Sequence, residues 1–478
     1  MKALDPEICR RARLSRDQRF DGEFFLAVTT TGIYCRPVCP ARPPRESNVR
    51  YYRSAAEAAQ AGFRPCLRCR PESAPLSPAW LGTETTLKRA LALIHEGYLN
   101  DNALGDLAAR LGVGERYLRK LFQQKLGVSP TSVAQTQRLH FAQKLLLETA
   151  LPITDVAFAS GFGSVRRFNS ATRDAFGCAA SELRRRPRQT VGGQGVTLTI
   201  AVRPPYDWRG LANFFTRHAV DGIESFSGNT YRRQLRTAQG AALVELRGEM
   251  SGEKQHLELN LLLSDNRDLM PTVALVRRMF DVDAQPLDIT ECLGADPRLA
   301  RLLKQSPGIR SPVYASPFEA CVRAVLGQQV STQAARRLCA GIASAADERV
   351  ELNGQDLLVF PGPRSMAAVP DKVLKMPRAR QRTFREICER FCDLDAEDSD
   401  TVLQAIGDIK GIGPWTLSLL AMRGYGQPDC FPDSDLGIVK AAEACGIGDR
   451  AALREACANW QPWRSYAANL LWRSLNNG

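Results

Sequence analysis

The spacing of apolar residues changes twice between residue 83 and the end of the sequence. Residues 83–186 show helical periodicity, interrupted only by short breaks at Gly and Pro. Apolar and polar residues then alternate in VTLTIAV (196–202), AALVELRGEM (241–250) and KQHLELNLLL (254–263), which predicts strands. From Pro312 onward the helical periodicity returns and continues to the end. Two stretches rich in Pro, Ser and Gly, 71–80 and 187–195, predict linkers.

Composition indicates a globular protein with several domains. The chain has 478 residues, of which 44% are hydrophobic and 24% charged, enough for about three or four domains and too apolar for general disorder. No apolar run approaches the roughly 18–20 residues of a membrane helix, and the first residues lack the apolar core of a signal peptide. We therefore expect a soluble, cytoplasmic protein.

The positive charge is concentrated in the first two-fifths of the chain. Residues 1–190 hold 30 of the 64 Lys and Arg but only 17 of the 51 Asp and Glu, so they account for the whole net charge of +13. A basic segment joined to a balanced one is typical of a nucleic-acid-binding module fused to a second function.

Four of the 14 cysteines form two close pairs. Ten are scattered, and most of these are expected to be small buried hydrophobic residues, whereas CRPVC and CLRC bring together the other four. Paired cysteines at such spacings can bind one tetrahedral ion, and four thiolates favour zinc. Spacing alone leaves open a purely structural zinc knuckle. The expected ligands of one zinc per chain are Cys35, Cys39, Cys66 and Cys69.

The sequence around these cysteines resembles a known family. FFLAVTTTGIYCRPVCPAR and GFRPCLRCRPE, within residues 5–75, are similar to the N-terminal domain of the Ada family. That family moves a methyl group from a DNA phosphotriester onto a zinc-bound cysteine. The resemblance implies that Cys35 accepts the methyl group in a single turnover. The family's second acceptor cysteine precedes a histidine; none of the four histidines here follows a cysteine, so that activity is not expected.

Two copies of a helix–Gly turn–helix pattern occupy residues 103–127 and 153–177. One copy alone is often a helical hairpin without a DNA role, but both second helices carry cations. GFGSVRRFNSATRDAFGCAASELRR resembles the AraC family of transcription factors, over residues 84–186. The resemblance implies recognition helices near 114–124 and 163–174. It does not distinguish residues that contact base edges from residues that contact phosphates. The expected DNA-binding residues are Arg116, Arg119, Lys120, Arg166 and Arg167.

The segment IGDIKGIGPWTLSLLAMR (406–423) predicts a helix-hairpin-helix. Its G-I-G turn, with Gly411 and Gly413, can present backbone N–H groups to a DNA phosphate without side-chain obstruction. About 20 residues further on lies a loop rich in Pro and Asp, CFPDSDLGIVKA (430–441). The two features together are typical of helix-hairpin-helix glycosylases.

Residues 196–478 resemble the AlkA-type 3-methyladenine DNA glycosylase II family. The similarity includes PPYDW, FEACVRAVLGQQVS and QPWRSYAANLLW. It implies that Asp435 is the catalytic carboxylate, with Asp433 as the alternative. Trp415 stands where strand-cleaving relatives have a lysine, which predicts a monofunctional enzyme.

Further residues of this half have roles implied by the resemblance. Trp415 and Trp472 are expected to stack on a flipped base, the alternative being a core position for each. Gln329 occupies the position that fills the DNA gap, where an apolar residue is usual, and Leu419 replaces a pocket aromatic. Both departures affect the expected substrate range rather than the reaction.

Together these observations predict a multidomain DNA alkylation repair and response protein. The leading hypothesis is an enzyme, and the alternative is a methylation-responsive activator whose C-terminal half binds damaged bases without turnover. Expected partners are alkylated double-stranded DNA, specific promoter sites and RNA polymerase, with no membrane, in the bacterial cytoplasm at the nucleoid. The expected units are a small zinc-bound α+β domain (1–78), an all-α tandem helix-turn-helix domain (80–188), an α+β, TBP-like subdomain (195–311) and an all-α helix-hairpin-helix domain (312–478).

Overall fold

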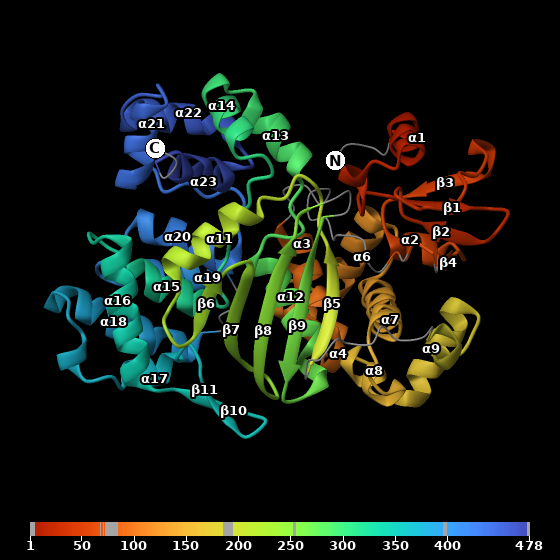
Figure 1. Cartoon of the computed structure of the whole chain (residues 1–478), viewed down its shortest axis with the longest axis horizontal. Helices are drawn as coiled ribbons and strands as arrows, with labels where there is room; N and C mark the ends of the chain where they lie inside the picture. The colour runs from red at the N-terminus through yellow and green to blue at the C-terminus, as the bar shows by residue number, and fades with distance from the viewer. Residues whose placement is uncertain are drawn as a thin grey trace.

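The computed structural model describes residues 5–66, 68–69, 71, 85–184, 195–251, 255–394 and 399–475. The stretches expected to be linkers, 71–80 and 187–195, lie almost wholly outside the described residues. Within the described ranges, no helix is both long and apolar enough to cross a bilayer. Figure 1 shows a small N-terminal sheet at one side, a larger five-stranded sheet in the centre and helices on both sides of it.

A four-stranded sheet, in the order β3-β1-β2-β4, organises the N-terminal unit. All four residues of β1 are buried because both faces of the sheet are covered. Phe25 and Ala27 pack with Ala58 of helix α2, whereas Leu26 and Val28 pack with three of the clustered cysteines. Because successive side chains of a strand point to opposite faces, one face of β1 packs against α2 and the other against the cysteine cluster. The elements are α1 (Pro6–Ser15), β1 (Phe25–Val28), β2 (Ile33–Cys35), β3 (Val49–Tyr52), α2 (Ala55–Gln60) and β4 (Arg64–Pro65).

Two helix-turn-helix units follow, joined by the long helix α7. Each second helix buries one apolar face, including Leu118 and Phe122 in α6 and Phe168 and Phe176 in α9, and turns the opposite face to solvent. The helices are α3 (Thr85–His95), α4 (Tyr98–Asp101), α5 (Leu104–Arg110), α6 (Glu115–Leu126), α7 (Pro130–Glu148), α8 (Ile153–Ala159), α9 (Val165–Phe176) and α10 (Ala180–Leu183).

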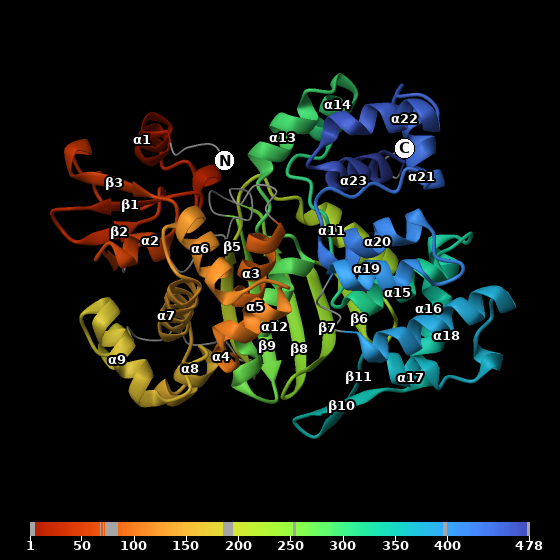
Figure 2. The same cartoon turned by 180° about the vertical axis from the view of Figure 1, so that it is seen from behind.

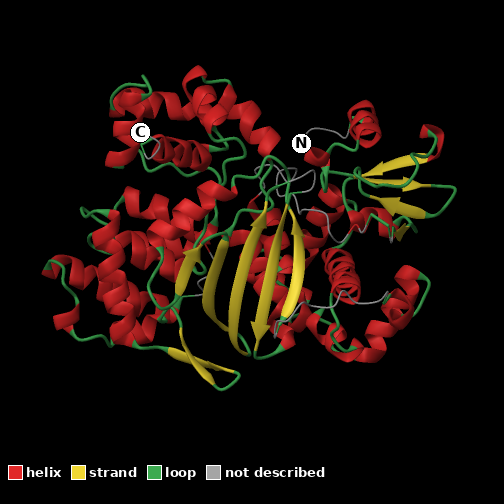
Figure 3. Ribbon diagram, viewed as in Figure 1, coloured by secondary structure: helices red, strands yellow, loops and turns green. Residues whose placement is uncertain are grey.

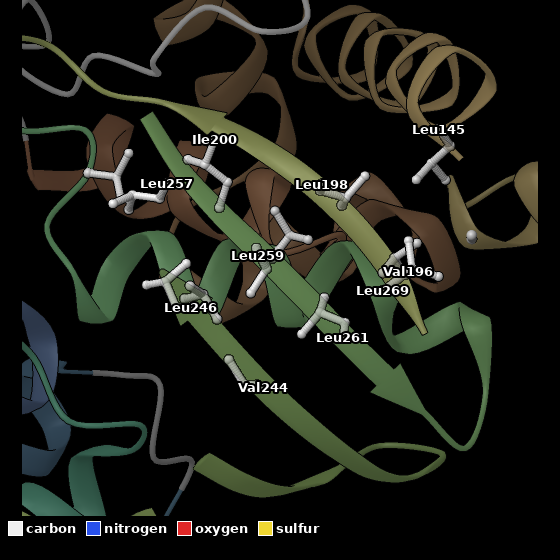
Figure 4. Close-up of a cluster of buried hydrophobic side chains, with 14 of the residues drawn as sticks. Leu145, Val196, Leu198, Ile200, Val244, Leu246, Leu257, Leu259, Leu261 and Leu269 are labelled. Atoms are coloured by element: carbon white, nitrogen blue, oxygen red, sulfur yellow. The ribbon is translucent and has the colours of Figure 1, made fainter. Parts of the chain in front are cut away.

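The central sheet is antiparallel in the order β5-β9-β8-β7-β6. The alternation seen in the sequence is the burial pattern of its strands, with every second residue of β5 buried. Leu198 and Leu259 of this sheet belong to the same hydrophobic core as Leu145 of α7 and Leu269 of α12 (Figure 4). The second helix-turn-helix unit and the sheet therefore share one core. The elements are β5 (Val196–Ala201), α11 (Trp208–His218), β6 (Glu224–Ser227), β7 (Thr230–Thr237), β8 (Gly240–Glu249), β9 (His256–Leu263) and α12 (Leu269–Met279).

The remaining helices form two cores, grouped around α15–α20 and around α13, α14 and α21–α23 (Figures 1 and 2). Helices α13 and α14 thus share a core with the C-terminal helices. The elements are α13 (Pro286–Gly294), α14 (Pro297–Gln305), α15 (Pro317–Leu326), α16 (Thr332–Ala346), β10 (Arg349–Leu352), β11 (Gln355–Leu358), α17 (Pro363–Ala367), α18 (Arg378–Asp393), α19 (Ser399–Gly407), α20 (Pro414–Tyr425), α21 (Leu436–Ala444), α22 (Arg450–Cys457) and α23 (Arg464–Ser474).

One element of this region departs from the all-α expectation. Strands β10 and β11 form a two-stranded hairpin, visible in Figure 3 beside the large sheet. Its turn contains Asn353 and Gly354, both with positive φ. Asn-Gly between alternating apolar residues favours such a turn, because both central residues must adopt left-handed conformations.

A buried ionic network attaches the sheet to the helices. Arg233 of β7 donates to Glu224 at 2.9 Å and also pairs with Glu319 of α15, and Arg323 of α15 joins both carboxylates. Burial opposes ionisation of Glu224, but the guanidinium groups of Arg323 and Arg233 hold its pKa down at about 2. Removing one member leaves charges buried without their partner.

We therefore expect Arg233→Ala to lower the free energy of unfolding of the C-terminal half by about 3–5 kcal/mol. Five of the six tryptophans lie beyond residue 195, so urea denaturation followed by tryptophan fluorescence reports on this half. Arg232→Ala is the matched control, because the adjacent Arg232 is exposed and pairs with Glu245 at the surface. Equal losses for the two variants would contradict the assigned role of the network.

Candidate functional sites

The N-terminal site is a cluster of four thiols at one edge of the small sheet. Strands β2 and β4 pair in parallel, so Cys35 at the end of β2 lies beside Cys66, which follows β4. The turns after these strands supply Cys39 and Cys69. The four Sγ atoms all lie within 4.8 Å of one another. Zn–S bonds of about 2.3 Å in a tetrahedron require similar sulfur separations, so the donor set fits one zinc ion per chain.

The four cysteines are not equivalent. Cys35, Cys66 and Cys69 are buried, whereas Cys39 is partly exposed. The N–H of Arg36 donates to the Sγ of Cys69 at 3.3 Å. Within the described residues, the structure records no such backbone donor to Cys35.

Two contacts beside the cluster were not anticipated from the sequence. The guanidinium of Arg36 pairs with the buried carboxylate of Asp21 and donates to the carbonyl of Cys69 at 3.2 Å. Tyr34, next to Cys35, shares a hydrogen bond with His140 of α7, and burial lowers the pKa of His140 to about 4. Sequence offers no signal for a contact between residues so far apart.

The two second helices of the helix-turn-helix units begin and end within two residues of the expected recognition helices. Arg116, Lys120, Arg166 and Arg167 are exposed on them. Arg119 is exposed too, but its guanidinium pairs with Glu115 one turn earlier at 2.6 Å. Tyr117 is 53% exposed among these cations and was not singled out from the sequence. An exposed aromatic ring among cations suits contact with nucleic acid.

The C-terminal site is a cavity of about 440 Å³ between the two helical cores. Residues of α11, α15, α16, α20 and α23 line it, and Asp435 stands at its edge. Trp415 enters from the first turn of α20 and Trp472 from α23. The expected pocket residues are therefore brought together, and Leu419 also lines the cavity.

Both tryptophans are bonded to the candidate carboxylate. The indole N–H of Trp415 donates to Asp435 Oδ2 at 2.9 Å, and that of Trp472 donates to Oδ1 at 2.9 Å. Asp435 also caps α21 by accepting the N–H of Ile438 at 3.0 Å. Donors from three helices thus hold the carboxylate at the cavity edge.

Asp433 has a different environment. It pairs with Arg450 at 3.4 Å and with Arg454, both on α22, and it is not among the residues lining the cavity. Its charge is therefore engaged by two guanidinium groups outside the pocket.

A buried cation supports the aromatic wall. Arg423 lies over the rings of Phe214 and Trp472, at 4.7 and 5.4 Å from their centroids, and donates to Asn469 at 2.6 Å. Burial lowers its pKa to about 10, so it remains protonated at neutral pH. Its contact with Trp472 fixes one face of that ring.

Hydrogen bonds connect the hairpin turn to the loop that carries Gln329. Gly411 has a φ of +96° and lies so close to Thr383 that a Cβ would clash with its hydroxyl, whereas a Cβ at Gly413 would meet nothing. Gln328 donates to the carbonyl of Gly411 at 3.0 Å and to Thr416 at 3.1 Å. The next residue, Gln329, is exposed with a φ of +55°. A non-glycine residue in this conformation is uncommon and often marks a functional position.

Comparison with known families covers three parts of the chain. A family model described as the metal binding domain of Ada matches residues 8–72. A helix-turn-helix domain model matches residues 107–186, and a model described as the AlkA N-terminal domain matches residues 197–316.

Individual relatives cover the whole chain or its C-terminal part. A Mycobacterium tuberculosis protein named probable bifunctional transcriptional activator/DNA repair enzyme AlkA is 40% identical over 485 residues, which cover 99% of this chain and 97% of that protein. The Escherichia coli DNA-3-methyladenine glycosylase 2 is 28% identical, covering 57% of this chain and 96% of its own. The solved structure of a 3-methyladenine DNA-glycosylase from Archaeoglobus fulgidus is 19% identical with a TM-score of 0.51, over 57% of this chain and 96% of that one, and shows a shared fold.

The thiol cluster predicts a metal content that can be measured on the full chain. We expect one zinc per chain, and we expect Cys69→Ala to weaken zinc binding strongly because a structural site needs all four ligands. Cys292→Ala is the control, since this cysteine lies on α13 outside the cluster. Elemental analysis and titration with a chelator measure both. Unchanged zinc affinity in Cys69→Ala would exclude Cys69 as a ligand.

Proposed function

The chain belongs to the family of AlkA-type bifunctional transcriptional activators and DNA repair enzymes, and we propose on this basis that it repairs alkylated DNA at two sites and regulates transcription. The observation that carries the repair activity is the carboxylate of Asp435, held by two tryptophans at the edge of a cavity of about 440 Å³. The reaction is hydrolysis of the bond between an alkylated purine and its sugar.

Catalysis begins when the damaged nucleotide leaves the duplex and enters the cavity. Alkylation of a ring nitrogen makes the purine cationic, so it stacks well on the faces of Trp415 and Trp472. As the base departs, positive charge develops on the sugar. Asp435 lies at the cavity edge to stabilise that charge and to orient water. Cleavage breaks the C–N bond, and water adds to the sugar carbon.

Strand cleavage is not part of this function. Forming a Schiff base requires a lysine amine, and the corresponding position is occupied by Trp415. The N–H of that indole donates to Asp435 instead. The enzyme is thus a monofunctional glycosylase of the DNA-3-methyladenine type.

The hairpin and the adjoining loop bind the DNA. The backbone of the turn at Gly411 and Gly413 offers N–H groups to a phosphate, and nothing at Gly413 obstructs their approach. Gln329 fills the space left by the flipped base and hydrogen-bonds the orphaned partner. Because Gln328 bonds the turn, the two contacts approach the duplex as one unit.

The second repair site transfers a methyl group to Cys35. Bound zinc keeps a cysteine as thiolate at neutral pH. The Sγ of Cys35 attacks the methyl carbon of a phosphotriester; an S–C bond forms, the C–O bond breaks and the phosphodiester leaves as an anion. The N–H of Arg36 withdraws charge from the Sγ of Cys69, which disfavours Cys69 as the nucleophile. The choice of Cys35 among the other three rests on its position in the matched metal binding domain of Ada. The thioether is not hydrolysed, so each molecule reacts once.

The regulatory part reads DNA through α6 and α9. Arg116, Lys120, Arg166 and Arg167 contact phosphates or base edges in adjacent major-groove segments. Methylation of Cys35 removes one negative charge from the cluster and so strengthens binding to DNA. RNA polymerase, at promoters in the nucleoid, is the partner that such regulation requires.

For the glycosylase, we expect Asp435→Asn to lower excision by about 10²–10³-fold or more, because the shape is kept and the charge is lost. Release of methyladenine from alkylated duplex measures this, and a gel before alkali tests for strand cleavage. Binding to a duplex with an abasic analogue should largely survive.

Asp433→Asn is the matched control, two residues away on the same loop, and should retain excision. Loss of excision in Asp433→Asn but not in Asp435→Asn would reverse the assignment, and nicks before alkali would contradict the monofunctional mechanism. Absence of excision by the wild-type chain would favour an activator that binds damaged bases without turnover.

For the methyl acceptor, we expect a single methyl group on Cys35 after incubation with DNA that carries methylphosphotriesters. Mass spectrometry of the digested protein locates it, and Cys35→Ala should remain unmodified. Cys39 is the informative alternative because it is the most exposed of the four. Methyl on Cys39 would mean that access, rather than position in the family's motif, selects the acceptor.

A further inference from the structure

The two proposed DNA-binding surfaces lie on opposite sides of the five-stranded sheet. Helix α9 is at one end of the longest axis, with α6 nearer the sheet, and α16 and α18 are at the other end (Figures 1 and 2). The loop preceding α16 carries Gln329, and α18 contacts the hairpin turn where Thr383 donates to the carbonyl of Lys410 at 2.7 Å. The five-stranded sheet stands between the two ends.

Both ends present cations without a carboxylate partner. At the N-terminal end, Arg166 and Arg167 of α9 are exposed and form no ion pair within the described part of the chain. At the other end, Arg378 of α18 and Lys410 of the hairpin turn are also exposed, and neither forms an ion pair with a residue that the structure describes. Each end therefore suits a phosphate backbone on its own.

The two ends cannot swing toward each other, because the halves are packed together. The second helix-turn-helix unit shares a core with the sheet, and Glu148 of α7 accepts the N–H of Thr199 of β5 at 2.9 Å. Arg278 of α12 pairs with Glu96 at 2.7 Å. The fully buried Arg203 donates to the carbonyls of Asp21 and Asp283, both at 2.9 Å.

A single short duplex cannot contact both DNA-binding surfaces at once. DNA has a persistence length of about 150 base pairs, and bending 20–30 base pairs by 40–90° already costs about 1–6 kcal/mol. Reaching both ends would require the duplex to wrap around the body that contains the sheet.

We propose that one molecule binds two separate DNA segments at once, one on α6 and α9 and one on the hairpin and cavity. This proposal rests on the DNA-binding roles proposed above and adds that the two surfaces are independent. A molecule held at its own site then presents its glycosylase to neighbouring DNA at a raised local concentration. Binding at a promoter leaves the repair site free.

The test uses two labelled duplexes of about 25 base pairs, far below the persistence length of about 150. The first is selected from a random-sequence pool with the Arg378→Gln/Lys410→Gln chain, so that it binds through the recognition helices. The second contains a tetrahydrofuran abasic analogue. Each is first titrated alone, and both are then combined with the full-length protein. We expect energy transfer between the labels and, by sedimentation, one chain with both duplexes.

Variants assign each duplex to its end. Arg166→Gln/Arg167→Gln should lose the first duplex and Arg378→Gln/Lys410→Gln should weaken the second, each lowering the salt slope of that binding by about two. Energy transfer should fall in both variants. Arg232→Gln/Arg247→Gln, which neutralises two exposed cations on the sheet, is the control and should change neither.

Displacement of one duplex by the other, with each binding well alone, would overturn the proposal while leaving the DNA-binding roles intact. Failure of either duplex to bind alone would instead refute the corresponding role, and the bridging with it. Energy transfer that appears only in complexes with two chains would also contradict bridging by one molecule.

Discussion

Burial of one leucine-rich surface by two domains is the constraint on which the arrangement of the chain depends. Leu145 of α7 and Leu198 of β5 belong to a single core, although one comes from a DNA-reading unit and the other from the sheet that supports the glycosylase helices. Separating the two would expose apolar area at a cost of about 25 cal/mol per Å². The packing of this shared core therefore sets the orientation of the two halves.

A similar dependence on two cores governs the glycosylase site. Trp415 lies in the first turn of α20, which packs mainly in the core of α15–α20. Trp472 lies on α23 and Asp435 caps α21, and both of these helices pack in the other core. Both indoles can therefore bond the one carboxylate only when the two cores are packed in this relative position. This also distinguishes two carboxylates on one loop: Asp433 is held by arginines of α22, and Asp435 by the aromatic walls of the cavity.

Sequence predicts those features that depend on local periodicity and spacing. The recognition helices, the G-I-G turn, the alternating strands and the cysteine pairs are of this kind, since each is written in a few neighbouring residues. The β10–β11 hairpin was also readable from its Asn-Gly turn but lay within a region dominated by helical periodicity. The contacts of Arg233 with Glu319, of Tyr34 with His140 and of Gln328 with Gly411 were not readable, because they join residues 83–106 positions apart. These residues become partners only in the folded structure.

The same distinction between local sequence and packed environment bears on the proposed methylation of a single thiol in a chain with 14 cysteines. Burial raises the pKa of Cys9, Cys339 and Cys430 to about 11 and that of Cys388 to about 12. At neutral pH these residues are thiols, which are poor nucleophiles, and the burial of Cys9, Cys339 and Cys388 also excludes a DNA backbone. The clustered cysteines differ because a shared metal ion stabilises the thiolate form. Within the cluster, the N–H of Arg36 donates to the sulfur of Cys69. Metal binding would thus separate the four clustered cysteines from the others, although all are the same type of residue.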